Sequence, residues 1–165
     1  MLPKLLAIDL DGTTLNSAGE ISAINQIQLR RITASGVQLV VATGRDIHSA
    51  SLYLKSIGIK TAYIVSLNGA AVFKLGQSKP LMVSTIPNEL IDQMAAIGDL
   101  DQVNTYFSTA LRSYTVIRDQ SLLAQFGLNE RVKVIKNVTE LGTDKQIVAK
   151  MLYCTKNPRL LAELV

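Results

Sequence analysis

Three short polar clusters hold the residues of this chain whose types and spacing could do chemistry together. Asp9 and Asp11 stand two residues apart at the end of an apolar run, Thr43 and Gly44 follow a second run 34 residues later, and residues 66–69 close a third. Neighbouring carboxylates repel unless a cation joins them, and Mg²⁺ prefers oxygen ligands of this kind. A carboxylate can attack phosphorus, and a hydroxyl beside an unobstructed N–H suits phosphate oxygens. The clusters therefore predict Mg²⁺-assisted chemistry on a phosphate group.

The elements that must position these clusters are alternating strands and helices. Strands are predicted over residues 4–10, 37–42 and 61–67, and helices over 22–35 and 46–57. This alternation indicates a parallel sheet with right-handed crossovers, whose ligands bind at the carboxyl ends of the strands. Ser22 is the expected N-cap of the first helix. The apolar stripes expected on the two helices are Ile24, Ile27, Leu29, Ile32 and Ala34, and then Ile47, Leu52, Leu54 and Ile57.

The same clusters resemble the motifs of the haloacid dehalogenase (HAD) superfamily. Residues 9–15 (DLDGTTL) are similar to its first signature, Asp-x-Asp-x-Thr, and residues 41–45 (VATGR) to its second motif. Residues 66–70 (SLNGA) resemble a segment typical of the Cof-like phosphatases, the branch with a large type IIB cap. The resemblance implies an α/β fold, a HAD-like Rossmannoid parallel sheet with an inserted α+β cap domain.

The resemblance also implies roles for the first two clusters. Asp9 would be the nucleophile that forms an aspartyl-phosphate, and Asp11 would protonate the leaving alkoxide and then activate water. The Asp9 carboxylate and the Asp11 backbone carbonyl would hold Mg²⁺, so that both residues belong to the metal site. Thr43, with Gly44 nearby, would hold the transferring phosphoryl group. The implied substrates are small phosphorylated metabolites.

The resemblance further implies that four residues shape the loops of the site or contact the substrate. Gly12 would permit the turn after the first strand, and Thr13 would steady it. Arg45 and Asn68 would lie near the active site.

The second half of the chain is interpreted as the cap. We expect residues 1–79 to form the N-terminal part of the core and residues 80–165 the cap, with the boundary correct to within five residues. The expected elements are a hairpin of strands 70–75 and 80–85, helices 88–97 and 119–126, strands 103–107, 112–117 and 148–154, an extended stretch 132–135, and a last helix capped by Asn157.

Two further motifs of the family are not found in this sequence, a lysine and an acidic Gly-Asp segment. We therefore expect an incomplete sheet and an incomplete Mg²⁺ site, and a truncated chain that is weakly active or inactive. The first strand would then be an uncovered sheet edge, which invites a homo-oligomer or a strand swap.

Composition excludes several classes of protein. With 48% apolar and 18% charged residues the chain is too apolar for a disordered protein. The net charge of +4 comes from residues 1–79, but nucleic-acid binding is disfavoured because there is no Lys/Arg run and aromatic residues are only 5%. No apolar stretch is long enough for a membrane span. The single cysteine, Cys154, fits a reducing compartment, so we expect a cytoplasmic protein.

Alternative functions remain open at this point. One is a non-catalytic remnant of the superfamily or an interaction module that keeps the fold. Another is a phosphomutase, because members with that activity share the first motif. A third is a phospho-accepting receiver domain, against which the order Asp-x-Asp-Gly-Thr and the large second half both argue.

Overall fold

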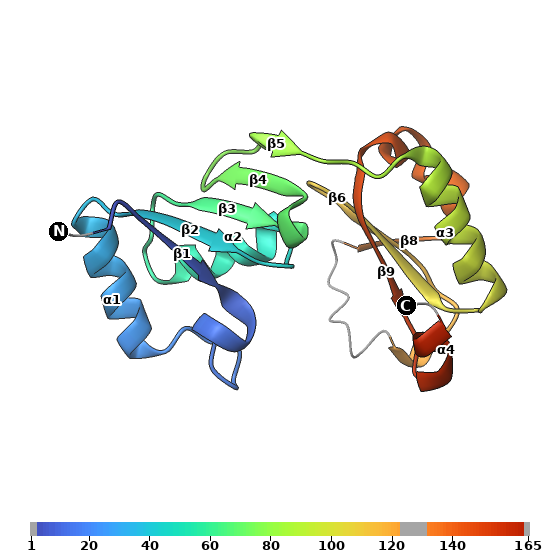
Figure 1. The fold of residues 1–165 in the computed structure, drawn as a ribbon, viewed down its shortest axis with the longest axis horizontal. Coiled ribbons are helices and arrows are strands. Elements are labelled where there is room, and N and C mark those ends of the chain that lie inside the picture. Colours follow the sequence, from blue (N-terminus) through green and yellow to red (C-terminus); the bar gives the residue numbers. More distant parts are fainter. Residues whose placement is uncertain (1–2, 123–131, 164–165) are drawn as a thin grey trace. The chain divides into compact units, whose positions relative to one another are not determined.

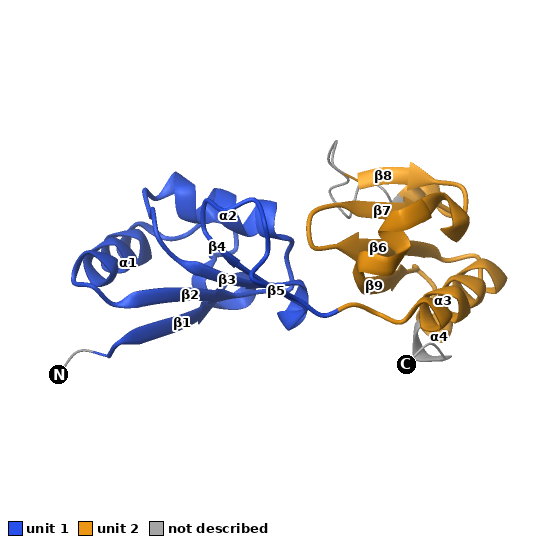
Figure 2. Cartoon of the chain, turned by 90° about the horizontal axis from the view of Figure 1, so that it is seen from above, with its two compact units in different colours: residues 1–84 blue, residues 85–165 orange. Residues whose placement is uncertain are grey.

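The chain folds as two units, each with its own sheet and its own buried core. A computed structural model describes residues 3–122 and 132–163. Its two compact units are Met1–Ser84 and Thr85–Val165 (Figure 2). Within the described residues, no helix has the length and apolar character that crossing a bilayer requires.

The sheet of the first unit has five strands that lie side by side in chain order (Figure 1). They are β1 (Leu5–Asp9), β2 (Gln38–Ala42), β3 (Tyr63–Ser66), β4 (Ala71–Lys74) and β5 (Met82–Val83). β1, β2 and β3 run parallel, whereas β4 and β5 add to the sheet as antiparallel strands. The predicted parallel sheet is thus confirmed.

Two helices connect the parallel strands and pack into one core with them. α1 (Ala23–Ala34) joins β1 to β2, and α2 (Ile47–Ser56) joins β2 to β3. Leu39, Val41 and Ile64 point into this core and are fully buried. The opposite face is more open, and Leu5 on β1 is 54% exposed. β1 forms one edge of the sheet and pairs only with β2 among the described strands.

The helix starts follow the sequence, but the predicted helical faces were partly wrong. Ser22 caps α1 as expected, because its Oγ accepts the Asn25 N–H at 3.3 Å. Of the α1 stripe only Leu29 is fully buried, while Ile24 is 73% exposed and Ile27 49% exposed. At about 3.6 residues per turn, these two isoleucines project from the side of the helix away from Leu29. Leu52 of α2, also expected to point inward, is 53% exposed.

The second unit is an α+β body around a four-stranded sheet in the order β8-β7-β6-β9. The strands are β6 (Asn104–Thr109), β7 (Ser113–Val116), β8 (Val132–Ile135) and β9 (Val148–Cys154). The helices are α3 (Asn88–Leu100) and α4 (Pro158–Glu163), with a 3₁₀ segment over Val138–Ile147. Phe107, Ile91 and Val148 are fully buried in the core that α3 covers.

The expected elements of the second half are largely present. Asn157 caps α4, because its Oδ1 accepts the Arg159 N–H at 3.0 Å. Of the helix expected over 119–126, residues 123–126 lie outside the described residues, and Gln120–Leu122 form a 3₁₀ segment. The hairpin of β4 and β5 belongs to the first unit, because β4 pairs with β3 and β5 with β4. The boundary between the two units along the chain therefore lies between residues 84 and 85, five positions after the expected boundary at 79/80.

Candidate active site

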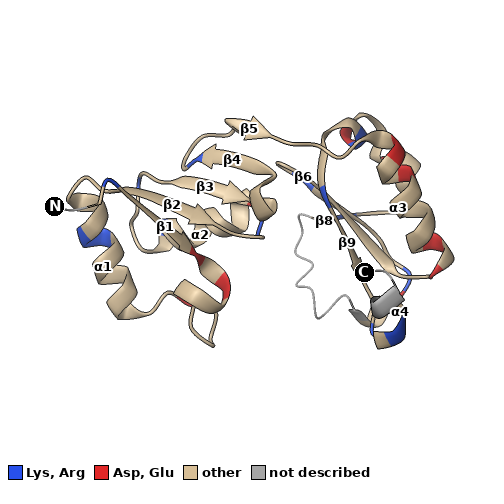
Figure 3. Cartoon of the chain, viewed as in Figure 1, with Lys and Arg blue, Asp and Glu red and all other residues tan. Residues whose placement is uncertain are grey.

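The parallel sheet brings the three polar clusters to one edge. In the strand register Asp9 lies beside Ala42, and Ala42 beside Val65, so β1, β2 and β3 end at the same level. Figure 1 shows the arrowheads of these strands at one edge of the sheet, and side-chain and backbone contacts link the loops that follow them. The acidic positions at the end of β1 and in the turn after it stand out in Figure 3.

The turn after β1 binds both the side chain and the backbone carbonyl of Asp9 through hydrogen bonds. Leu10–Thr14 form a π-helical turn in which Gly12 has φ +72°, a left-handed conformation that suits glycine. The Thr13 hydroxyl donates to Asp9 Oδ2 at 3.1 Å, and the Thr14 hydroxyl donates to the Asp9 backbone carbonyl at 2.5 Å. The Asp9 carboxylate is thus oriented at the end of the strand while its side chain stays exposed.

Arg45 joins the second cluster to the first through a two-pronged ion pair with Asp11. Its Nη2 donates to Asp11 Oδ1 at 2.6 Å and its Nε to Oδ2 at 2.8 Å. This hydrogen bonding holds the pKa of Asp11 below its usual range, against the opposing effect of partial burial. The same contact raises the pKa of Arg45. The side chains are 34% exposed for Arg45 and 55% exposed for Asp11, so water screens the pair.

Two residues of α2 complete the surroundings of Arg45. Its Nη1 donates to Ser49 Oγ at 3.2 Å, and its guanidinium lies over the ring of Tyr53, 5.1 Å from the centroid. The sequence interpretation did not single out either residue. Ser49 and Tyr53 are four residues apart and so share one side of α2, and this face just after Arg45 is the signal that would have found them.

Thr43 ties the second cluster to the third through the backbone. The Thr43 N–H donates to the Val65 carbonyl at 2.9 Å, and its carbonyl accepts the Asn68 N–H at 3.1 Å. The Thr43 side chain is 5% exposed, and its Oγ1 accepts the Arg45 N–H at 3.2 Å. Gly44 lies between these two residues in the chain. The hydroxyl hydrogen of Thr43 remains able to donate to a ligand oxygen.

The loop after β3 is strained where it meets Thr43. Leu67 (φ +53°) and Asn68 (φ +58°) both have left-handed backbones, which are uncommon for residues other than glycine. The Leu67 N–H donates to the Arg45 carbonyl at 3.1 Å, which holds this loop against the second cluster. Such strain is of the order of 1–3 kcal/mol for each residue and tends to occur at functional sites.

The donor atoms at this edge suit a hard cation. The Asp9 carboxylate accepts the Thr13 hydroxyl at Oδ2 and stays exposed at the end of β1, where a cation can reach it. A carboxylate and backbone carbonyls, completed by waters, are ligands that Mg²⁺ accepts. In the described part of the chain no three His, Cys, Asp or Glu side chains gather as a metal-binding group. Any cation here would therefore rely on few protein ligands.

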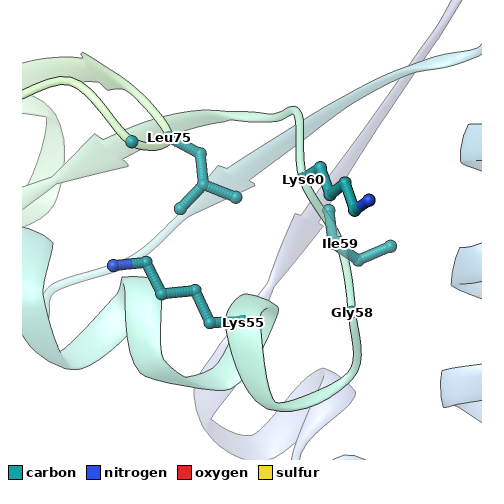
Figure 4. A pocket seen from close by; sticks show the side chains of 6 residues that line it. Lys55, Gly58, Ile59, Lys60 and Leu75 are labelled. Carbon is teal, nitrogen blue, oxygen red and sulfur yellow. The ribbon is translucent and has the colours of Figure 1, made fainter.

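A hollow of about 360 Å³ in the first unit lies away from these clusters. Figure 4 shows its lining, with Ile59 and Leu75 as the apolar part and Lys55 and Lys60 as the charged part. The lining residues precede β3 and follow β4, so the hollow lies at the opposite ends of the strands. It therefore has no part in the chemistry of Asp9.

Comparisons with known proteins agree with the motifs. A family model described as haloacid dehalogenase-like hydrolase matches residues 6–162. Phosphatase YwpJ of Bacillus subtilis is 44% identical over 69 residues, which are 42% of this chain and 24% of YwpJ. The Bacillus subtilis 5-amino-6-(5-phospho-D-ribitylamino)uracil phosphatase YitU is 28% identical over 145 residues, 86% of this chain and 53% of YitU.

A solved structure carries the same fold. The structure of a haloacid dehalogenase-like hydrolase from Bacillus subtilis aligns with a TM-score of 0.81 at 24% identity, over 97% of this chain and 64% of that protein. This chain thus spans less than two thirds of each of these three proteins.

Proposed function

The chain belongs to the haloacid dehalogenase-like hydrolases, in the Cof-like phosphatase branch, and from this we propose that it hydrolyses phosphate monoesters of small metabolites. The phosphatase names of its relatives support this reaction. Because the chain spans less than two thirds of each relative and the described residues offer few metal ligands, the 165 residues alone would turn over slowly.

The proposed reaction has two steps at Asp9. An Asp9 carboxylate oxygen attacks phosphorus, the bond from phosphorus to the ester oxygen breaks, and Asp11 gives its proton to the departing alkoxide. Asp11 then takes a proton from water, which attacks the aspartyl-phosphate, releases inorganic phosphate and restores Asp9. Mg²⁺, when held by the Asp9 carboxylate and the Asp11 carbonyl, would offset the negative charge of both carboxylate and phosphate.

The observation that carries this proposal is the convergence of three loops on one small volume. The Arg45–Asp11 ion pair links the first loop to the second, and the hydrogen bond from the Asn68 N–H to the Thr43 carbonyl links the second to the third. In this arrangement the Thr43 hydroxyl would bind a phosphoryl oxygen, with Gly44 beside it. Phosphoryl transfer depends mainly on such positioning and on charge neutralisation.

The proposed role of Asp11 as the general acid of the first step conflicts with its ion pair. A general acid must carry a proton, but Arg45 donates to both carboxylate oxygens of Asp11 and favours the ionised form. For the first step Asp11 would therefore have to leave Arg45, and the phosphate of the substrate would be the competing anion. In the second step the ionised form is the one required.

The test is phosphate release from 4-nitrophenyl phosphate and from a panel of sugar phosphates, with and without Mg²⁺. We expect slow, Mg²⁺-dependent release that Asp9→Asn abolishes and that Glu20→Gln, at an exposed position of the same unit, leaves unchanged. Intact-mass measurement of acid-quenched protein should detect a phosphoryl group in the wild type and none in Asp9→Asn. If the wild type neither releases phosphate nor acquires the group, the chain is not a phosphatase by itself.

A further inference from the structure

The guanidinium of Arg45 is held by more than its partner carboxylate. Besides the two hydrogen bonds to Asp11, it donates to Ser49 and lies over the Tyr53 ring at 5.1 Å. Arg45 precedes α2 by two residues, and Ser49 and Tyr53, one turn apart on α2, both support its side chain. This support comes from a regular helix, which is a more rigid base than a loop.

The backbone of Arg45 is fixed independently of its side chain. Its N–H donates to Thr43 Oγ1 at 3.2 Å, and its carbonyl accepts the Leu67 N–H at 3.1 Å. The remaining freedom lies in the long side chain. An ion pair that is a third or more exposed restrains such a side chain weakly, because water competes for both charges. The contacts with Ser49 and Tyr53 therefore add to the ion pair in fixing where the guanidinium rests.

We propose that Tyr53, assisted by Ser49, is a positioning residue of the phosphatase site: its ring holds the Arg45 guanidinium, which in turn holds the Asp11 carboxylate. The proposal rests on the proposed function, since it matters for catalysis in the second step, where Asp11 must be ionised and in place to take a proton from water. Misplacing a catalytic group by a fraction of an ångström lowers the rate. A residue two helical turns from the site would thus influence the reaction without touching the substrate.

Tyr53 is well placed for a substitution test. It packs at the border of the core of the first unit, and it also lines a hollow of about 320 Å³ together with Ile21, Gln26 and Ile57. Because part of its surroundings is open, a change to leucine removes the π-face without forcing a neighbour to move. Phenylalanine keeps the ring and serves as the conservative variant.

The Arg45 Nε–H is a direct reporter, because it donates to Asp11 Oδ2. Its hydrogen exchange and chemical shift can be followed by NMR in the full 165-residue chain, whether or not that chain turns over substrate. A cation over an aromatic ring at an exposed site is worth a two- to fivefold change in population, so Tyr53→Leu should raise the exchange rate of this proton about two- to fivefold. Tyr53→Phe should leave the rate within about the error of the wild-type value, and Ser49→Ala should raise it.

Tyr63→Leu is the matched control, because Tyr63 is a half-buried tyrosine on β3 of the same unit. It should leave Arg45 exchange unchanged even if it lowers the melting temperature. Equal exchange in Tyr53→Leu and wild type, or an equal rise in Tyr63→Leu, would overturn the proposal. If Tyr53→Leu fails to fold, Tyr53→Met, which also removes the ring, takes its place: an unchanged Arg45 exchange rate in that variant counts against the proposal, and an increase supports it.

Kinetics add a second readout. In wild-type protein that hydrolyses 4-nitrophenyl phosphate, Tyr53→Leu should slow the hydrolysis of the aspartyl-phosphate, so kcat should fall by about two- to fivefold and the acid-quenched protein should carry more of the phosphoryl group. Tyr53→Phe should restore both values. A rise in KM alone would contradict a role through Asp11. Absence of turnover in the wild type would refute the proposed function of this chain, while the exchange data would still decide the role of Tyr53.

Discussion

Gly98 is the position at which a single added methyl group should disturb the second unit most clearly. It lies in α3 where the helix crosses β6. A Cβ built on Gly98 would lie 2.2 Å from Thr105 Oγ1 and 3.3 Å from Tyr153 Cε1. Thr105 is 3% exposed, so its side chain cannot move out into solvent to make room. The contact must open by about 0.8 Å to reach the shortest Cβ contacts found in proteins, 3.0 Å.

The magnitude of the effect of Gly98→Ala is the difference of two opposing terms. Alanine is favoured over glycine in a helix interior by about 1 kcal/mol. Forcing an extra methyl group into a packed core costs about 1–3 kcal/mol, and the size of this overlap points to the upper end. We therefore expect Gly98→Ala to lower the free energy of unfolding of this unit by about 2 kcal/mol.

The assay is urea unfolding, followed together with amide exchange in β6, which reports on the second unit alone. Ala96→Gly, on the exposed side of the same helix, isolates the helix-propensity term and should cost about 1 kcal/mol. Thr105→Ala removes the obstructing oxygen. The free energy of unfolding of the double variant with Gly98→Ala should therefore be higher, by about 1 kcal/mol or more, than the value expected if the two single losses simply added. A Gly98→Ala protein as stable as the wild type would refute the close helix–strand approach.

Three further predictions concern the first unit. Asp11→Asn should lower kcat by about 10²–10⁴-fold and change the free energy of unfolding by less than about 1 kcal/mol, which paired kinetic and urea measurements would check; retained turnover would exclude Asp11 as the acid–base group. Because Arg45 lowers the pKa of Asp11, their ion pair stabilises the fold fully at pH values above the ordinary aspartate pKa of about 3.9, and this stabilisation is lost as the pH falls through the lowered pKa. In Arg45→Gln, an NMR titration should show the pKa of Asp11 moving back towards about 3.9. Sedimentation velocity should show self-association that Leu5→Lys weakens, because β1 is an edge strand among the described residues and Leu5 on it is 54% exposed; a concentration-independent monomer would contradict this.

The strands and the three polar clusters could be predicted from local pattern. Short apolar runs bounded by Asp-Gly, Thr-Gly and Asn-Gly mark buried parallel strands and their exits, and β1, β2 and β3 end within a residue or so of the predicted positions. The faces of α1 were harder to predict. Its apolar residues are spread around the helix, so only packing shows that Leu29 is inside and Ile24 outside.

The sequence by itself therefore determined which residues stand at the ends of the strands, because that depends on short-range alternation of apolar runs and turn residues. It also carried the family resemblance, through motifs that are local in the chain. Only the tertiary structure decided that Arg45 binds Asp11, 34 residues away, and that Tyr53 lies under the guanidinium. Such contacts depend on the order and register of strands and on the direction of long side chains, which no local pattern contains.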